Sequence, residues 1–186
     1  EAVADVPAND NGIFGFGNDG SNVGMTNLVS STGVIAADVA AVGTARHGPA
    51  ACEYGADKGI FGYGDGSVLS MTNLVSNSGV VGSDVTGVGT ARTYLAACSY
   101  GTDFDKGIFG YGYTPSNVSM TNLVTNVGVV GTDVTGVGTG RRGLGACEYG
   151  DDKGIFGYGT VDGPSAQGMT NLVTNVGVVG TDVTGV

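Results

Sequence analysis

Short apolar stretches, each ended by Gly, Asp, Asn or Ser, run along the whole chain. Between residues 47 and 92 they cover 50–54, 59–63, 71–76 and 79–85, five to seven residues each. Val, Ile, Tyr, Phe and Thr are frequent in them, and this length is typical of strands. Glycine recurs too often for a stable helix. The pattern therefore predicts an all-β chain in which these four stretches form an antiparallel meander.

The same four stretches return along the chain, which makes it a tandem repeat. The segment GIFG begins at Gly12, Gly59, Gly107 and Gly154, a spacing of 47, 48 and 47 residues. Dividing the chain after each recurring arginine gives units 1–46, 47–92, 93–141 and 142–186. We expect these units to form a single domain over residues 1–186.

Apolar residues occupy both faces of the second stretch. Because side chains alternate along a strand, we expect Phe61 and Tyr63 to share one face and Ile60 and Gly62 to share the other. One sheet cannot cover both of its own faces, so neighbouring units are expected to pack face to face. Burying the repeated Ile–Phe pair in four units would give a gross gain on the order of 10–20 kcal/mol.

Composition narrows the classes of partner. The chain carries 17 Asp and Glu against 7 Lys and Arg, a net charge of −10. An extended nucleic-acid surface needs the opposite sign, so we expect no nucleic-acid partner. No apolar run approaches the ~18 residues of a membrane helix, so we expect no membrane insertion. The 37 glycines follow no three-residue period, which excludes collagen.

One cysteine occupies the same position in each of the last three units, at Cys52, Cys98 and Cys147. An odd number at equivalent positions is a poor disulfide framework, and no CxxC pair suggests zinc. We interpret the three as small buried apolar side chains. A symmetric three-thiol metal site is the alternative.

The order of features within a unit follows a known pattern. An arginine opens the unit, a small-residue first strand such as 95–99 follows, and an aromatic–glycine second strand comes next. A third strand at MTNLV and a fourth leading to the next arginine complete it. This order resembles the kelch-type β-propeller repeat over all four units. The kelch Gly-Gly doublet is replaced by Gly62-Tyr63-Gly64, and the chain has no Trp. The DKGIFGYG and TNLVS segments also resemble repeats of uncharacterised phage or virion-associated proteins.

The kelch resemblance implies a four-bladed β-propeller built from four ~47-residue, four-stranded antiparallel repeats. The small side chains of 95–99 would suit the crowded axis of a small propeller. Four equal units suggest that one chain closes the ring. The alternatives are two chains that close one eight-bladed ring, or units that stack into a filament.

Arginine recurs where each of the last three units begins, at Arg46, Arg92 and Arg141. Around a central channel these side chains would form a positive collar that binds an anion as ligand. Alternatively, each arginine pairs with a nearby aspartate or backbone carbonyl and fixes the junction between units. The position is tied to the repeat itself, so we favour the structural interpretation.

Aspartate occupies one position in all four units, at Asp38, Asp84, Asp133 and Asp182. Acidic residues on turns are candidate Ca²⁺ ligands, but no dense oxygen-bearing loop surrounds these. Hydrogen bonds from backbone N–H groups to turn aspartates explain the series equally well. We therefore expect no cofactor, with Ca²⁺ bound by these aspartates as the alternative.

The loop between the second and third stretches varies most, at 65–67, 114–117 and 160–167. Such variation places it on the outside of the fold. Asn117 begins the only Asn-x-Ser/Thr sequon in the chain and is a candidate glycosylation site. The single histidine, His47, has no marked catalytic partners.

No group of acid, base and nucleophile stands out from the repeats. We therefore expect a non-enzymatic structural or binding module, extracellular or on a virion surface. Its partners would be copies of itself or another surface or virion protein. One alternative is a lectin-like module that binds glycans through the variable loops. The other is an assembly protein that forms filaments or oligomers.

Overall fold

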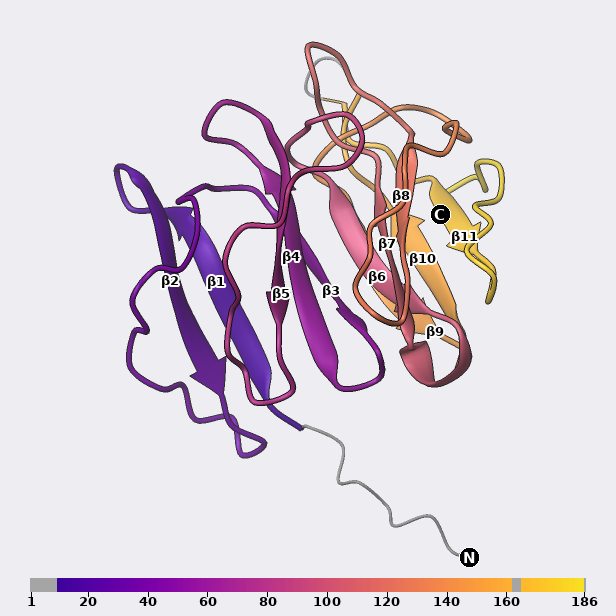
Figure 1. Ribbon diagram of the computed structural model, residues 1–186. Coiled ribbons are helices and arrows are strands. Elements are labelled where there is room, and N and C mark those ends of the chain that lie inside the picture. The colour runs from indigo at the N-terminus through magenta and orange to yellow at the C-terminus, as the bar shows by residue number, and fades with distance from the viewer. Residues whose placement is uncertain (1–9, 162–164, 186) are drawn as a thin grey trace, which may run out of the picture.

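A computed structural model of the chain describes residues 10–161 and 165–185. Within these residues the chain forms eleven strands in four separate antiparallel sheets, one short 3₁₀ turn and no α-helix (Figure 1). The prediction of an all-β chain is confirmed. The predicted first stretch of the first unit lies outside the described residues.

One sheet falls in each unit, and its strands follow each other in chain order. The first sheet contains β1 (Gly12–Asn18) and β2 (Asn22–Val29). The second contains β3 (Ala50–Tyr54), β4 (Lys58–Gly64) and β5 (Leu69–Val75). The third contains β6 (Ala96–Tyr100), β7 (Lys106–Gly110) and β8 (Thr121–Val124), with the 3₁₀ turn η1 (Thr102–Phe104) between β6 and β7. The fourth contains β9 (Gly145–Tyr149), β10 (Lys153–Gly157) and β11 (Thr170–Val173).

The predicted fourth strand of each unit is present only as isolated bridges. In the second unit Val81 bridges Val75, and Val85 bridges Thr72. Between these bridges the side-chain amide of Asn73 donates to the carbonyl of Gly82 at 3.0 Å. A side chain thus takes the place of a strand partner, and the ladder is interrupted. The prediction of four regular strands per unit is therefore wrong by one.

The aromatic residue of the GYG segment sits in a β-bulge, which breaks the expected alternation. The register of β4 against β5 shifts between Gly62 and Gly64, and Tyr63 has φ 64°. A bulge re-aims the side chain that it carries. Tyr63 therefore packs in one cluster with Ile60, whereas Phe61 packs in another on the opposite face. The expectation that Phe61 and Tyr63 share a face is wrong.

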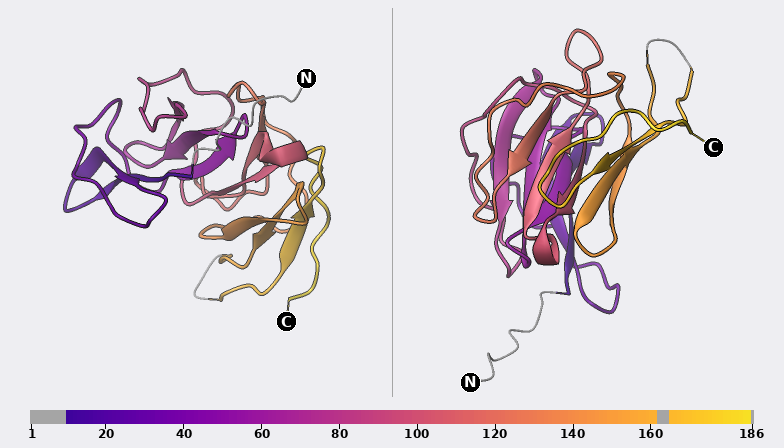
Figure 2. Two further views of the ribbon diagram at one scale, coloured as in Figure 1. Left: turned by 90° about the horizontal axis from the view of Figure 1, so that it is seen from below. Right: turned by 90° about the vertical axis from the view of Figure 1, so that its right-hand side faces the viewer.

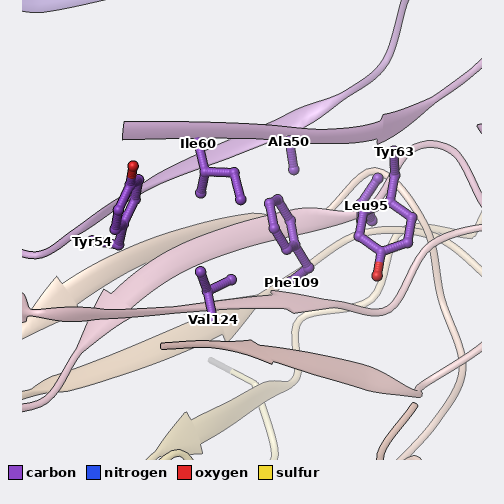
Figure 3. Close-up of a cluster of buried hydrophobic side chains, with 7 residues drawn as sticks. All are labelled: Ala50, Tyr54, Ile60, Tyr63, Leu95, Phe109 and Val124. Atoms are coloured by element: carbon purple, nitrogen blue, oxygen red, sulfur yellow. The ribbon is translucent and has the colours of Figure 1, made fainter. Parts of the chain in front are cut away.

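The sheets stack face to face along a curved row, with the first and last sheets at its two ends (Figures 1 and 2). The first strands approach one another, since β3 contacts β6 and β6 contacts β9. Between the second and third sheets, Ile60 and Tyr63 of β4 face Phe109 of β7 and Val124 of β8 (Figure 3). Each inner sheet is thus covered on both faces by its neighbours, as the pattern predicts.

Candidate functional site

The recurring arginines are fully buried between neighbouring sheets. The Arg92 guanidinium has 0% exposure and donates from Nη2 to Oδ1 of Asn122 at 2.7 Å. Its Nε donates to the carbonyl of Tyr111 at 2.9 Å. Its Nη1 donates to the carbonyl of Thr90 at 3.2 Å. The guanidinium also lies 4.2 Å from the ring centroid of Tyr63, a distance typical of cation–π contacts. One side chain therefore binds the second sheet to the third.

An aspartate of the following unit completes this arrangement. Asp133 accepts hydrogen bonds from the backbone N–H and the hydroxyl of Thr90, at 3.0 and 2.7 Å. It also accepts from Nδ2 of Asn122 at 3.0 Å, and Nη1 of Arg92 lies 4.0 Å away. We call the set of threonine, arginine, stacked ring, asparagine and aspartate an arginine joint. Its first three members come from one unit and its last two from the next.

The described residues contain three such joints, one between each pair of neighbouring sheets. The first joint comprises Thr44, Arg46, Phe16, Asn73 and Asp84. The second is the one built around Arg92. The third comprises Thr139, Arg141, Tyr111, Asn171 and Asp182. One detail differs: Nε of Arg46 has no hydrogen-bond partner, whereas Nε of Arg92 and of Arg141 each bind a backbone carbonyl.

Burial and pairing change the ionisation of these groups. Desolvation lowers the pKa of Arg46 to about 10, and the charge of Asp84 opposes part of that change. The guanidinium is still charged at neutral pH. Burial alone would raise the pKa of Asp84, but hydrogen bonds from Thr44 and Asn73 and the charge of Arg46 outweigh it and lower the pKa. The joint therefore keeps both the buried guanidinium and the partly exposed carboxylate in their charged forms.

This geometry favours the structural interpretation of the arginines over the anion-binding collar. Arg92 and Arg141 donate to the protein from Nε, Nη1 and Nη2, and both side chains are fully buried. An anion in solvent therefore has no open route to them. The sequence did not single out the asparagine of each joint. The sequence did contain a sign of this asparagine, since TNLV returns in every unit with Asn at the same place.

The aspartates do not lie where they would gather around a metal ion. Asp84, Asp133 and Asp182 each belong to a different joint, and their oxygens accept hydrogen bonds from Thr and Asn. Asp38 is exposed and accepts from Nδ2 of Asn27 at 2.8 Å. Among the described residues no three His, Cys, Asp or Glu side chains form a cluster able to hold a metal.

The cysteines differ in environment from unit to unit. Cys98 is buried, Cys52 is half-buried and Cys147 is exposed. Burial raises the pKa of Cys98 to about 12 and also raises that of Cys52, so neither thiol is reactive at neutral pH. The interpretation as small buried side chains holds fully for Cys98 and is wrong for Cys147, which lies at the open end of the row.

The loops that follow the middle strands β1, β4 and β7 gather at one end of the molecule, the upper end in Figure 1. Asn117 lies in the third of these loops and is half-buried, and its Oδ1 accepts from Nη1 of Arg142 at 3.1 Å. Arg142 also stacks at 4.6 Å on Tyr113. In the first pair of units His47 binds Oδ1 of Asn22 through Nδ1 at 2.7 Å. Residues of consecutive units thus meet at this end too.

A cavity of about 370 Å³ is lined mainly by the first and second sheets and also by Phe104 of the third unit and Glu148 of the fourth, and no pattern in the sequence predicts it. Ile13, Leu28 and Ile60 form apolar parts of its wall, and Glu53 and Glu148 add carboxylates. Burial and the charge of Glu148 raise the pKa of Glu53. No described basic side chain other than Lys58 lines the cavity.

Two further observations concern membrane-spanning helices and similarity to known proteins. In the described part of the chain no helix has the length and apolar character needed to cross a lipid bilayer. Compared with the models of known protein families and with curated protein sequences, the chain shows no match to either.

Proposed function

We propose that this chain is a non-enzymatic structural or binding module, built as a propeller-type array of four blades, that acts at an extracellular or virion surface. The observation that supports this role is the use made of the recurring charged residues. Arginine and aspartate return in every joint, where the arginine donates to an asparagine of the next unit and the aspartate accepts from a threonine of the preceding one. The recurring chemistry of the sequence thus serves to hold sheets together.

The blade-like arrangement has support of its own. The small first strands β3 and β6 lie close to one another, as do β6 and β9, and the row of sheets is curved (Figure 2). Small-angle X-ray scattering tests this arrangement in solution. We expect a profile that fits a curved row of four sheets. A profile that fits only a straight stack would contradict the propeller-type array.

A screen with chromogenic ester, phosphate and glycoside substrates tests the non-enzymatic role. We expect no turnover above that of a heat-unfolded sample. Turnover that disappears on substitution of a described side chain, such as His47→Ala, would overturn the proposal.

A lectin-like module is the second candidate, favoured by the loops that gather at one end of the molecule. There the stacked Arg142 and Tyr113 present a flat polar surface of the kind that sugars contact. A glycan array tests this candidate, with Arg142→Ala as the variant expected to lose binding. Binding that the variant retains, or no binding at all, would remove this candidate and leave the structural role.

A further inference from the structure

Each pair of neighbouring sheets fits together through a phenylalanine and a glycine. Phe109 of the third sheet lies over Gly62 of the second, where an added Cβ would be 2.6 Å from its Cζ atom. Phe156 lies over Gly110 in the same way, also at 2.6 Å. The phenylalanine ring also meets the preceding bulge aromatic edge to face, with centroids 5.2 Å apart for Tyr63 and Phe109. The later sheet provides the ring and the earlier sheet provides the glycine.

A second set of contacts runs in the opposite direction. Sγ of Cys52 lies 2.5 Å from the Cβ position of Gly107, and Cys98 has the same relation to Gly154. Leu123 of the third sheet likewise approaches the turn glycine Gly177 of the fourth at 2.9 Å. In this set the earlier sheet provides the side chain and the later sheet provides the glycine. The two faces of a sheet are therefore different and complementary.

The first sheet presents one half of these contacts to solvent. Phe14, the counterpart of Phe109, is 64% exposed, whereas Phe61, Phe109 and Phe156 are at most 5% exposed. A side chain at Gly33, the counterpart of Gly177, would meet no atom within 4 Å. At Gly12 the only atoms near an added Cβ belong to Val29 of the same sheet.

The fourth sheet presents the other half. Tyr158, the counterpart of Tyr63, is 56% exposed, and Leu172, the counterpart of Leu123, is 42% exposed. Cys147 is exposed as well. An added Cβ at Gly157 would meet only Thr170 of the same sheet, at 3.4 Å. Each group at this end thus has its complement at the other end of the row.

We propose that a second copy of this chain docks head to tail on the first. Phe14 of one copy lies over Gly157 and Tyr158 of the other, while Cys147 of that other copy lies against Gly12. The three internal contacts show what covers such a face, and the two open faces carry matching halves of the same contact. The interface is heterologous, because different surfaces of the two copies meet. This inference rests on the proposed structural role and names its partner.

Sedimentation equilibrium from micromolar to near-millimolar concentration tests the docking. We expect the weight-average mass to rise with concentration, and to rise further with added salt, because each copy carries a net charge of −10 that salt screens. A plateau at twice the monomer mass would mean that two copies close a ring, and a continuing rise would mean an open filament. Both outcomes support the docking. A monomer at every concentration overturns it.

Two variants locate the contact. Phe14→Ala and Gly157→Ala are each expected to abolish the rise in mass. Both should fold, since Phe14 is exposed and a methyl at Gly157 meets only an ordinary contact. Val127→Ala is the matched control, because Val127 is 68% exposed on a turn away from both end faces, and it should associate as the wild type does. Association that survives both end-face substitutions overturns the proposed surface.

A disulfide test establishes the direction of docking. Gly12→Cys combined with Cys147→Ser gives a chain that bears an end-face thiol only on its first sheet. Mixed with the wild type and oxidised, it should form a cross-linked pair between position 12 of one chain and Cys147 of the other. The same variant alone should form far less. Gly20→Cys, on a loop with no atom within 4 Å of its Cβ position, is the control. Equal cross-linking by the Gly20→Cys control overturns head-to-tail docking. The proposed non-enzymatic role is tested separately by the substrate screen, whose result does not depend on cross-linking.

Discussion

A buried guanidinium stabilises a fold only when its donors and its charge are both matched. In the second joint Arg92 meets three acceptors, an aromatic ring and a carboxylate at once. Taking a charge out of water costs several kcal/mol, and good geometry is needed to offset that cost. The joint is therefore much more sensitive to the loss of one member than an exposed ion pair such as that of Lys58 and Asp57, whose side chains are partly in solvent.

Arg92→Ala should destabilise the protein strongly. The substitution leaves the oxygen atoms of Asn122 and Tyr111 buried without their donor and Asp133 without its positive neighbour. We expect a loss of about 3–5 kcal/mol in the free energy of unfolding, measured by urea denaturation. Arg142→Ala is the control: Arg142 belongs to no joint and is only half-buried, so its loss should cost about 1 kcal/mol or less. Equal losses for the two variants would contradict the role assigned to the joint.

The joints also predict how stability depends on pH. In the folded protein the pKa values of Asp84, Asp133 and Asp182 lie below the ordinary 3.8. A group with a lowered folded pKa contributes stability above its unfolded pKa, and that contribution is lost as the pH falls through the folded value. We therefore expect the urea midpoint to hold from neutral pH down to about pH 4 and to fall below it.

Asp133→Asn provides the check on this pH dependence. The variant should have a lower urea midpoint than the wild type at pH 7. Its midpoint should fall less on acidification, since one of the three joint carboxylates has been removed. Asp19→Asn, on an exposed loop, should follow the wild-type curve. A wild-type midpoint that rises as the pH falls below about 4 would contradict the expected direction of the effect.

Sequence reasoning identified the arginines and aspartates of the joints and the pairing of arginine with an aspartate or a backbone carbonyl, but not the asparagine or the stacked ring. The positions of the arginines and aspartates follow directly from the repeat. The pairing of an arginine in one unit with an asparagine and an aspartate in the next depends on how the sheets stack, and strand patterns do not contain that information. The same limit applies to Cys147, which matches Cys52 and Cys98 in sequence and differs because no further sheet of the described residues covers it.

At the scale of strands, glycine acts by making room for a ring from the next sheet. The positions of the first three strands of a unit were predictable from the pattern: the stretch 50–54 matches β3 residue for residue, whereas 59–63 and 71–76 differ from β4 and β5 by one or two residues at each end. The bulge at Tyr63 was not predictable, because strict alternation assumes a regular strand. Two signals were present in the sequence, namely the Gly-aromatic-Gly segment and its return in every unit. The fourth stretch does not form a regular strand because the Asn73 side chain donates a hydrogen bond to one of its backbone carbonyls.

Gly62→Ala and Gly157→Ala form a matched pair that tests this use of glycine. A methyl at Gly62 would collide with Phe109, and overpacking of this kind costs about 1–3 kcal/mol. The same change at Gly157 meets Thr170 at an ordinary 3.4 Å, so the free energy of unfolding should change by about 0.5 kcal/mol or less. Urea denaturation at low protein concentration measures both. A larger loss at Gly157 than at Gly62 would contradict the ring-over-glycine packing.

At the scale of the whole molecule, the main contacts of each sheet are with its neighbours along the row, and Glu148 of the fourth sheet also reaches the cavity beside Glu53 of the second. Stability in such arrays is close to a sum of unit terms and nearest-neighbour contacts. No strand pairing or bridge joins the first sheet to the last among the described residues. A defect in a middle contact should therefore separate the array into two parts that unfold independently.

Phe109→Ala tests this behaviour. Phe109 is fully buried between the second and third sheets, so the cavity should cost about 3–5 kcal/mol. Hydrogen exchange monitored by mass spectrometry should then show residues 10–75 and residues 96–173 exchanging with different protection. Phe14→Ala, the exposed counterpart, should leave one cooperative transition. A single uniform loss of protection in Phe109→Ala would contradict the nearest-neighbour description.

The matching faces have a consequence for how such a chain changes in length. Because every joint pairs its arginine with the asparagine and aspartate of the next unit, whole units can replace one another at these positions. A deletion of residues 93–141 would bring Arg92 opposite Asn171 and Asp182, the partners that Arg141 has in the intact chain. Duplication or loss of a complete unit therefore preserves the partners of each remaining arginine, although contacts particular to one unit, such as those of Ser99 with Glu53 and Glu148, would change. Recombination between near-identical copies can thus change the number of units, provided that complete units are gained or lost.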